Sequence, residues 1–259
     1  MKNIEIDSIF KINESIKIDE IMKGLPEVRA ERDLWQNDFH QFTVYGHTKK
    51  FVMHLKNILE NERQKKEFDF LNLVAAGWLH DIGKPITAKP KEKDGKILER
   101  KSDKPYKKIY HKFLNHEIEG EKRVREMNPE IFKELGLNQE KVALLVGCHF
   151  LPMKGIKDVR KAKDLNEFLQ KYNDLKERLE KLSESNNGLI SKEEILLMFL
   201  ADKLGQGDPE KYVTDQEELF SIRNALLLKD KMQEEQKLKE IYNFQKVEAE
   251  KNKEYAIKE

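Results

Sequence analysis

A histidine and an aspartate stand side by side at the end of an apolar run, in Leu79-His80-Asp81-Ile82-Gly83-Lys84-Pro85. Imidazole nitrogen and carboxylate oxygen form the mixed ligand set that suits Zn, Mn, Fe, Co or Ni. Lys84 adds a cation close to the pair, where an anionic substrate would approach. Because a His-Asp pair is common by chance, it predicts a metal site only together with further ligands.

Further residues with metal-binding side chains lie on the expected helices, beside the apolar stripes. They are His47, His116, His149 and Asp202. A bundle of helices could bring all of them to one point with His80 and Asp81, as in helical metal proteins. One catalytic ion takes fewer protein ligands, since it keeps open positions. Two ions bridged by Asp81 would use the set better, one bound by His47, His80, Asp81 and Asp202 and the other by Asp81, His116 and His149.

Apolar stripes at helical spacing, with sparse Gly and Pro, predict a mostly helical chain. We expect helices at 41–61, 68–80, 111–127 and 138–149, a charged helix with an apolar packing stripe at 158–182, and a helix ending near Asp202. Ser191 and Glu194 form a capping box at the start of that last helix. We expect an N-terminal extension (1–30), a central domain (31–210) and a C-terminal helical extension (211–259).

A basic insertion interrupts the helices at 84–110. From Lys84 to Lys108 there are nine Lys and one Arg against two Asp and two Glu, a local net charge of +6. Asp94-Gly95 is a hairpin-type turn signal, so a small hairpin is expected here. Such a lysine run is usually a solvated loop, but its place directly after the His-Asp pair also suits a lid that attracts phosphate.

The composition of the 259 residues is that of a water-soluble chain, with 37% charged and 38% hydrophobic residues. The net charge of +1 does not indicate attraction of the whole protein to nucleic acid or membrane. Cys148 is the single cysteine, which excludes an intramolecular disulfide and fits a reducing compartment; we expect it to be a buried small residue. With no apolar run of the roughly 20 residues that span a bilayer and no signal-peptide core, we expect a cytoplasmic protein.

Several local motifs carry a family resemblance. They are Trp35-Gln36-Asn37-Asp38-Phe39-His40 with Val44 and His47-Thr48, the run from Leu79 to Pro85, Asn115-His116-Glu117 with Gly120, then His149 and Ala201-Asp202. Over about residues 30–205 the chain resembles the HD-domain metal-dependent phosphohydrolase superfamily. The nearest branch is the HD domains related to those of tRNA nucleotidyltransferases. The resemblance implies an all-α HD-domain helical bundle, here with the short basic insertion. No nucleotidyltransferase motif precedes the match, so substrate choice does not transfer.

The resemblance also implies roles for individual residues. His47, His80, Asp81 and Asp202 correspond to ligands of a first divalent metal, and His116 and His149 to ligands of a second. One or two ions of Mn, Fe, Co, Ni or Zn are expected, with Mg also open. Lys84 corresponds to a phosphate-binding or acid-base residue, and His40 to a substrate contact.

Two further residues have alternative interpretations, and a third is placed outside the site. His111 is either a surface histidine or a substrate contact. Glu117 either orients a neighbouring ligand or is a solvated helix acid. His54 lies on roughly the same helix face as His47 and is interpreted as a core histidine outside the site.

The expected function is a metal-dependent phosphohydrolase. It cleaves a phosphomonoester or phosphodiester, including a cyclic phosphate, of a nucleotide or nucleic-acid end with metal-activated water. Asp81 bridges or orients that water, Lys84 neutralises phosphate oxygens, and His40 or His111 protonates the leaving oxygen. Two alternatives stay open, a di-iron HD-type oxygenase and a non-catalytic nucleotide- or RNA-binding module. No membrane partner is expected. An oligomer is possible but not indicated, since the apolar stripe of the helix at 158–182 could equally serve a dimer.

Overall fold

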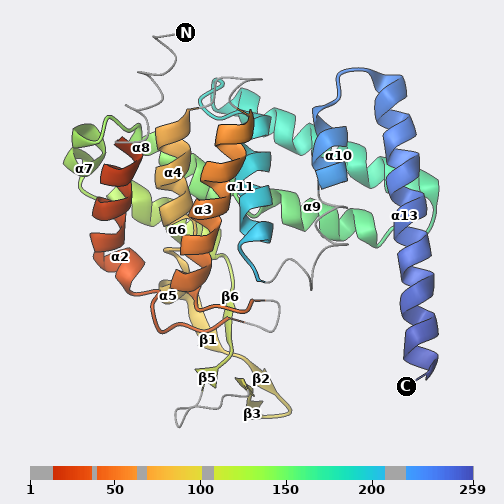
Figure 1. Cartoon of the computed structure of the whole chain (residues 1–259), viewed down its shortest axis with the longest axis horizontal. Coiled ribbons are helices and arrows are strands. Elements are labelled where there is room, and N and C mark those ends of the chain that lie inside the picture. The colour runs from red at the N-terminus through yellow and green to blue at the C-terminus, as the bar shows by residue number, and fades with distance from the viewer. Residues whose placement is uncertain (1–13, 37–39, 63–68, 101–107, 208–219, 259) are drawn as a thin grey trace. The chain divides into compact units, whose positions relative to one another are not determined.

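The computed structural model describes residues 14–36, 40–62, 69–100, 108–207 and 220–258 of the chain (Figure 1). The backbone forms two compact units. The first comprises residues 1–150 and 197–211, and the second comprises residues 151–196 and 212–259. Helices dominate both units, which confirms the all-α fold class expected from the sequence.

The first unit is built around α4 (Phe70–Leu79), whose residues from Asn72 to Leu79 are all buried. Its neighbours are α3 (Val44–Glu62) and α8 (Gln139–Cys148). A side chain at Gly77 would crowd the ring of Phe51 on α3, so the absence of a side chain lets the two helices approach closely. The helix predicted at 68–80 is therefore present, and it is the buried central one.

Helix α6 (His116–Glu126) packs along α8, and α7 (Pro129–Glu134) connects the two. The predicted helix at 111–127 is wrong at its start. Residues His111–Phe113 form strand β6, in which Lys112 is exposed between two half-buried residues. Asn115 then takes the left-handed conformation (φ 58°), which reverses the chain before α6 begins.

The basic insertion begins with the short helix α5 (Lys84–Thr87) and continues as a narrow antiparallel ribbon that extends away from the helices (Figure 1). Its paired strands are β1 (Ala88–Pro90) with β6, β2 (Glu92–Lys93) with β3 (Lys96–Ile97), and β4 (Glu99–Arg100) with β5 (Lys108–Ile109). Asp94 and Gly95 have φ of 52° and 72°, as a two-residue type I′ turn requires. The predicted hairpin is therefore present, within a longer ribbon; residues 101–107 of the insertion lie outside the described part.

The described part of the N-terminal segment packs into the first unit. Residues 14–24 are helical and α2 (Pro26–Arg29) follows. The carboxylate of Asp19 accepts hydrogen bonds from Lys56 (2.7 Å) and from the indole of Trp78 (2.8 Å), which ties this segment to α3 and α4. Residues 1–13 of the expected extension lie outside the described residues.

The second unit contains α9 (Leu151–Arg160), α10 (Leu165–Ser185), a helical segment at 220–227 and α13 (Lys231–Lys258). The single charged element expected at 158–182 is divided at Asp164, whose carboxylate caps α10 by accepting from the amide of Glu167 (2.9 Å). Segment 151–196, which the sequence analysis places within the central domain, packs here with residues of the C-terminal part. In the described residues no helix is both long and apolar enough to cross a membrane.

Helix α11 (Lys192–Leu204) begins in the second unit, and its residues from Leu197 onward belong to the first. The predicted capping box at its start is confirmed. The amide of Ser191 donates to the carboxylate of Glu194 (2.8 Å), and the amide of Glu194 donates back to the Ser191 hydroxyl (3.2 Å). The C-terminal part of the helix meets α3 through Asp202, whose Oδ1 lies 3.0 Å from His47 Nε2. The chain just after it meets the segment before α3, where the amide of Gln41 donates to the carbonyl of Gln206 (2.9 Å).

Candidate metal centre

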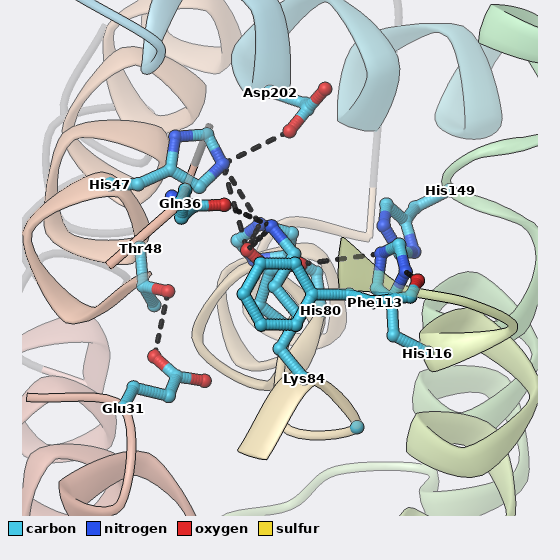
Figure 2. Close-up of polar contacts among 12 residues, drawn as sticks. Glu31, Gln36, His47, Thr48, His80, Lys84, Phe113, His116, His149 and Asp202 are labelled. Carbon is cyan, nitrogen blue, oxygen red and sulfur yellow. Dashed lines mark hydrogen bonds and ion pairs between the residues drawn. The ribbon is translucent and has the colours of Figure 1, made fainter. Parts of the chain in front are cut away.

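The ends and faces of several helices in the first unit bring the predicted ligands together (Figure 2). His80 and His149 cap the C-terminal ends of α4 and α8, and Asp81 follows His80 in the turn. The remaining ligand candidates are His47 on α3, His116 at the start of α6 and Asp202 near the end of α11. All six side chains are buried. A side chain at Gly83 would collide with the carbonyl oxygen of His116, so this glycine lets α6 approach the turn that carries Asp81.

The ligand atoms form two groups, and within each group all of them lie within 4.8 Å of one another. The first group is His47, His80 and Asp202; the second group is Asp81, His116 and His149. The carboxylate of Asp81 faces both, because its Oδ2 lies 3.2 Å from His80 Nε2 and its Oδ1 lies 3.5 Å from His116 Nε2. This position suits the bridge between two ions that the sequence predicts.

The imidazole rings present their Nε2 atoms to the centre. His80, His116 and His149 each direct Nδ1 at the backbone carbonyl three residues earlier, at 2.8, 3.0 and 2.6 Å. A carbonyl only accepts, so each of these Nδ1 atoms carries a proton, and Nε2 is the ring atom that faces the centre and can bind a cation. Metal-binding histidines in proteins are oriented in the same way.

The spacing within the first group and an unpaired oxygen of Asp81 both fit a divalent cation. His47 Nε2 lies 3.0 Å from Asp202 Oδ1 and 3.3 Å from His80 Nε2. Donors bound about 2.1 Å from one ion lie about 3.0–3.4 Å apart, so these spacings suit a shared ion. In addition, Asp81 Oδ1, on the carboxylate that faces both groups, is buried and has no hydrogen-bond partner among the described residues. The mixed nitrogen and oxygen set suits Mn, Fe, Co, Ni or Zn.

The surroundings of the site keep its carboxylates ionised and His149 neutral, which are the forms that bind a cation. Burial raises the pKa of Asp81, but His80 and Lys84 outweigh it, so its pKa lies well below the usual value. In the same way Lys203 and His47 outweigh burial at Asp202, whose pKa is also well below its usual value. Burial, with His80 and His116 nearby, lowers the pKa of His149 to about 3. The carboxylates are therefore ionised and His149 is neutral near pH 7.

Lys84 is buried beside Asp81. Its ammonium donates to Asp81 Oδ2 and to Gln36 Oε1, both at 2.6 Å, and it lies over the ring of Phe113. Lys84 follows the His-Asp turn as the first residue of α5. The structure thus brings a fixed cation into direct contact with the carboxylate that faces both groups.

The other predicted site residues lie around this centre. The ring of His40 meets that of His47 edge to face, with centroids 5.1 Å apart. His111 Nδ1 lies 3.1 Å from the carbonyl oxygen of Trp35. Neither His40 nor His111 belongs to the two ligand groups, and neither does His54. Glu117 is buried with a carboxylate oxygen 3.5 Å from His116 Nδ1, which agrees with an orienting role, and Cys148 is buried as expected.

Three residues that contribute to the site had no role assigned to them from the sequence, although Gln36 lies in one of the motifs of the family resemblance. Glu31 is fully buried and accepts a hydrogen bond from the hydroxyl of Thr48 (2.8 Å); burial and then Asp81 raise its pKa well above the usual value. Gln36 holds Lys84, and Phe51 stacks on His80 with ring centroids 4.1 Å apart. Phe51 lies one helical turn after His47, so its position on the ligand face could have been found from spacing. Glu31 lies in a turn without a periodic pattern, and no sequence signal marked it.

The amino-acid sequence also matches a known protein family. The HD domain family matches residues 40–207, a range that contains all six ligand candidates. The chain belongs to the HD domain family. Its members are largely metal-dependent phosphohydrolases, so this chain is a member of a metal-dependent hydrolase superfamily. Among curated proteins and solved structures, none matches the chain. The closer likeness to the HD domains of tRNA nucleotidyltransferases stays a prediction.

Proposed function

We propose that this HD-domain protein is a phosphohydrolase that cleaves a phosphomonoester or phosphodiester of a nucleotide or nucleic-acid end. The main support is that the candidate metal ligands lie next to a buried ammonium group. Two groups of buried ligands for divalent cations lie next to the ammonium of Lys84, which touches Asp81 at 2.6 Å. Cation ligands alone would fit many reactions, but a buried lysine beside them favours an anionic substrate.

The metal ligands would be His47, His80 and Asp202 for one ion and His116 and His149 for the other, with Asp81 facing both. Divalent cations held there would supply Lewis acidity, which lowers the pKa of water and polarises a phosphate. The ionised Asp81 would orient the attacking water, because its Oδ1 is buried and has no hydrogen-bond partner among the described residues. Lys84 would neutralise negative charge on the phosphate oxygens.

Two histidines are candidates to protonate the leaving oxygen. His40 lies closer to the ligands, because its ring contacts the ring of His47, but burial lowers its pKa well below the usual value, which disfavours it as an acid near pH 7. His111 lies on β6, where its ring stacks near Phe113, whose ring lies beneath Lys84. A substitution at each of these histidines, followed by comparison of good and poor leaving groups, separates the two. The acid matters most when the leaving group is poor.

The basic ribbon supports a nucleotide or nucleic-acid substrate. It starts directly after Lys84 and α5, and Lys89, Lys93 and Lys96 are exposed on it. Together with the +6 charge of residues 84–108, this surface would attract a polyanion toward the metal centre. A linear or a cyclic phosphate would fit these contacts equally well.

Reconstitution with single metals tests the proposed function. Protein stripped with a chelator is loaded with Mn, Fe, Co, Ni, Zn or Mg and given nucleotides, cyclic nucleotides, phosphorylated oligonucleotides and a generic phosphoester. We expect turnover of at least one class, and its loss in Asp81→Ala, while Asp158→Ala keeps it, because Asp158 lies half-exposed on α9, outside both ligand groups. No turnover with any metal would refute the hydrolase; oxygen uptake by iron-loaded protein, or tight binding without turnover, would identify the oxygenase or the binding module instead.

A charge reversal on the ribbon tests the substrate class. Lys93→Glu with Lys96→Glu is expected to weaken binding of an oligonucleotide and to reduce its salt dependence by about one unit of slope for each lysine. Hydrolysis of the generic phosphoester should not change, because both side chains are exposed at the β2–β3 turn. The matched control is Lys122→Glu with Lys133→Glu, on exposed positions of α6 and α7. Equal effects of the two pairs would argue against the ribbon as the binding surface.

A further inference from the structure

Gln36 lies in the loop that precedes α3, and its side chain is only 1% exposed. The backbone around it is held at both ends, because Trp35 forms an antiparallel bridge with Thr43 and the amide of Val44 donates to the carbonyl of Leu34 (2.9 Å). The loop that these contacts close also carries His40. The fold therefore fixes the Gln36 side chain next to the candidate metal centre (Figure 2).

The chemistry of Lys84 fixes the orientation of the Gln36 amide. An ammonium group only donates hydrogen bonds, so the amide atom 2.6 Å from Lys84 Nζ must be the oxygen Oε1. The nitrogen Nε2 on the same carbon then carries two N–H donors. Nε2 is buried and has no hydrogen-bond partner among the described residues. Because buried polar groups in native proteins are nearly always paired, such a donor beside a candidate site indicates contact with a ligand.

The charges around Gln36 narrow the class of ligand. Two of the three Lys84 N–H groups are directed at Asp81 Oδ2 and Gln36 Oε1, and Asp81 balances the charge of the ammonium. An anion that enters beside Lys84 meets the remaining N–H of the ammonium and the two N–H groups of Gln36. Donors without acceptors in this position suit an oxygen that only accepts, as a phosphoryl oxygen does.

We propose that Gln36 is a substrate-binding residue, which holds Lys84 through Oε1 and donates from Nε2 to a non-bridging oxygen of the substrate's phosphoryl group. This assignment rests on the proposed phosphohydrolase function, because that function supplies the phosphoryl group. It gives Gln36 two separable tasks. One is to position Lys84, and the other is to bind the substrate directly.

A double-mutant cycle separates the two tasks. Affinity for inorganic phosphate is measured by titration calorimetry on metal-loaded wild type, Gln36→Met, Lys84→Met and the double variant, with metal content as a second readout. We expect Gln36→Met to keep its metal and to lose about tenfold or more in phosphate affinity, the value of a hydrogen bond to a charged acceptor. We expect a comparable loss when the same substitution is added to Lys84→Met, where no lysine remains to be positioned.

Two further variants distinguish a loss of phosphate binding from a loss of folding. Gln36→Glu is nearly isosteric and keeps an acceptor for Lys84 but has no Nε2 donor, so it too should bind phosphate more weakly. Gln139→Met removes a glutamine whose Nε2 donates to the carbonyls of Val124 (2.8 Å) and Met127 (3.0 Å), and it should bind phosphate as wild type does. Gln139 lies ten residues before His149 along α8, about 15 Å away.

The outcomes distinguish this proposal from the proposed function. Wild-type affinity in Gln36→Glu, or a silent Gln36→Met in the Lys84→Met background, would overturn direct binding and leave a residue that only positions Lys84. If the metal-loaded wild type neither binds phosphate nor hydrolyses any phosphoester, the phosphohydrolase itself fails, and the role of Gln36 fails with it.

Discussion

The two ligand groups of the metal centre are assembled differently. In the first group, His47 Nε2 already lies 3.0 and 3.3 Å from the neighbouring ligand atoms, and the three residues come from distant helices. In the second group the contact between carboxylate and imidazole is longer, because Asp81 Oδ1 lies 3.5 Å from His116 Nε2. We infer that the first group binds its ion more tightly, since its spacings match those around one ion, whereas the second is more open.

The two groups also differ in their carboxylates. In the second group, burial lowers the pKa of both histidines, and that of His149 falls to about 3. The first group has its own carboxylate, Asp202, in contact with His47. The second group depends on Asp81, which is also shared with Lys84 and faces His80. The loss of Asp81 should therefore affect both groups, whereas other substitutions should affect one.

Asp81→Asn is expected to have the largest effect. Both groups lose their shared carboxylate, so metal content and hydrolysis should fall by more than the roughly 100-fold that loss of an outer-shell partner costs. The ammonium of Lys84 is then buried without its counter-ion, which costs about 3–5 kcal/mol of folding stability. Elemental analysis, turnover and urea denaturation measure the three effects.

The double variant Asp81→Asn with Lys84→Met controls for misfolding. It removes the buried charge together with its partner, so stability should return while metal binding does not. If the double variant regains its metal, Asp81 is not a ligand.

Asp202→Asn is expected to remove the ion of the first group alone. His47 and His80 lose their carboxylate neighbour, whereas Asp81, His116 and His149 are unchanged. Elemental analysis should show one ion per chain in place of two, and kcat/KM should fall by about 100-fold or more. Loss of both ions at once would contradict two separable groups.

His149→Gln is expected to have a smaller effect. It weakens the more open second group, so one ion should be lost and kcat/KM should fall by about 10–100-fold. His54→Gln is the matched control, because His54 lies on α3 outside both groups. If His149→Gln costs more than Asp202→Asn, the inferred order of the two groups is wrong.

The pH dependence of stability should report the burial of His149. Its pKa is about 3 in the folded chain against 6.5 in the unfolded one, so below pH 6.5 the unfolded state binds a proton that the folded state does not. Stability is fully present above pH 6.5 and is lost as the pH falls toward 3, by at most about 1.4 kcal/mol per pH unit for this group. Urea denaturation of chelator-treated protein at pH 7, 6 and 5 should show this slope, and His149→Gln should reduce it. An unchanged slope in that variant would contradict the assignment to His149.

Local pattern was sufficient for much of the fold. The central helix α4, the capping box of Ser191 and Glu194, and the Asp94-Gly95 turn depend on residues a few positions apart, so the sequence predicts them directly. The start of α6 was mispredicted, because three residues of alternating exposure carry little signal. Pairing with β1, more than twenty positions earlier in the chain, determines that His111–Phe113 is a strand.

The sequence determined which ligand types the chain carries and that they lie on or at the ends of helices, because both follow from residue identity and periodicity. The tertiary structure alone decided how these ligands divide into two groups. That division depends on where the end of α11 returns to α3 and on how closely α6 approaches Gly83. The same holds for Gln36 and Glu31, whose partners Lys84 and Thr48 are distant in the chain. Contacts of this kind arise from long-range packing, which no local pattern records.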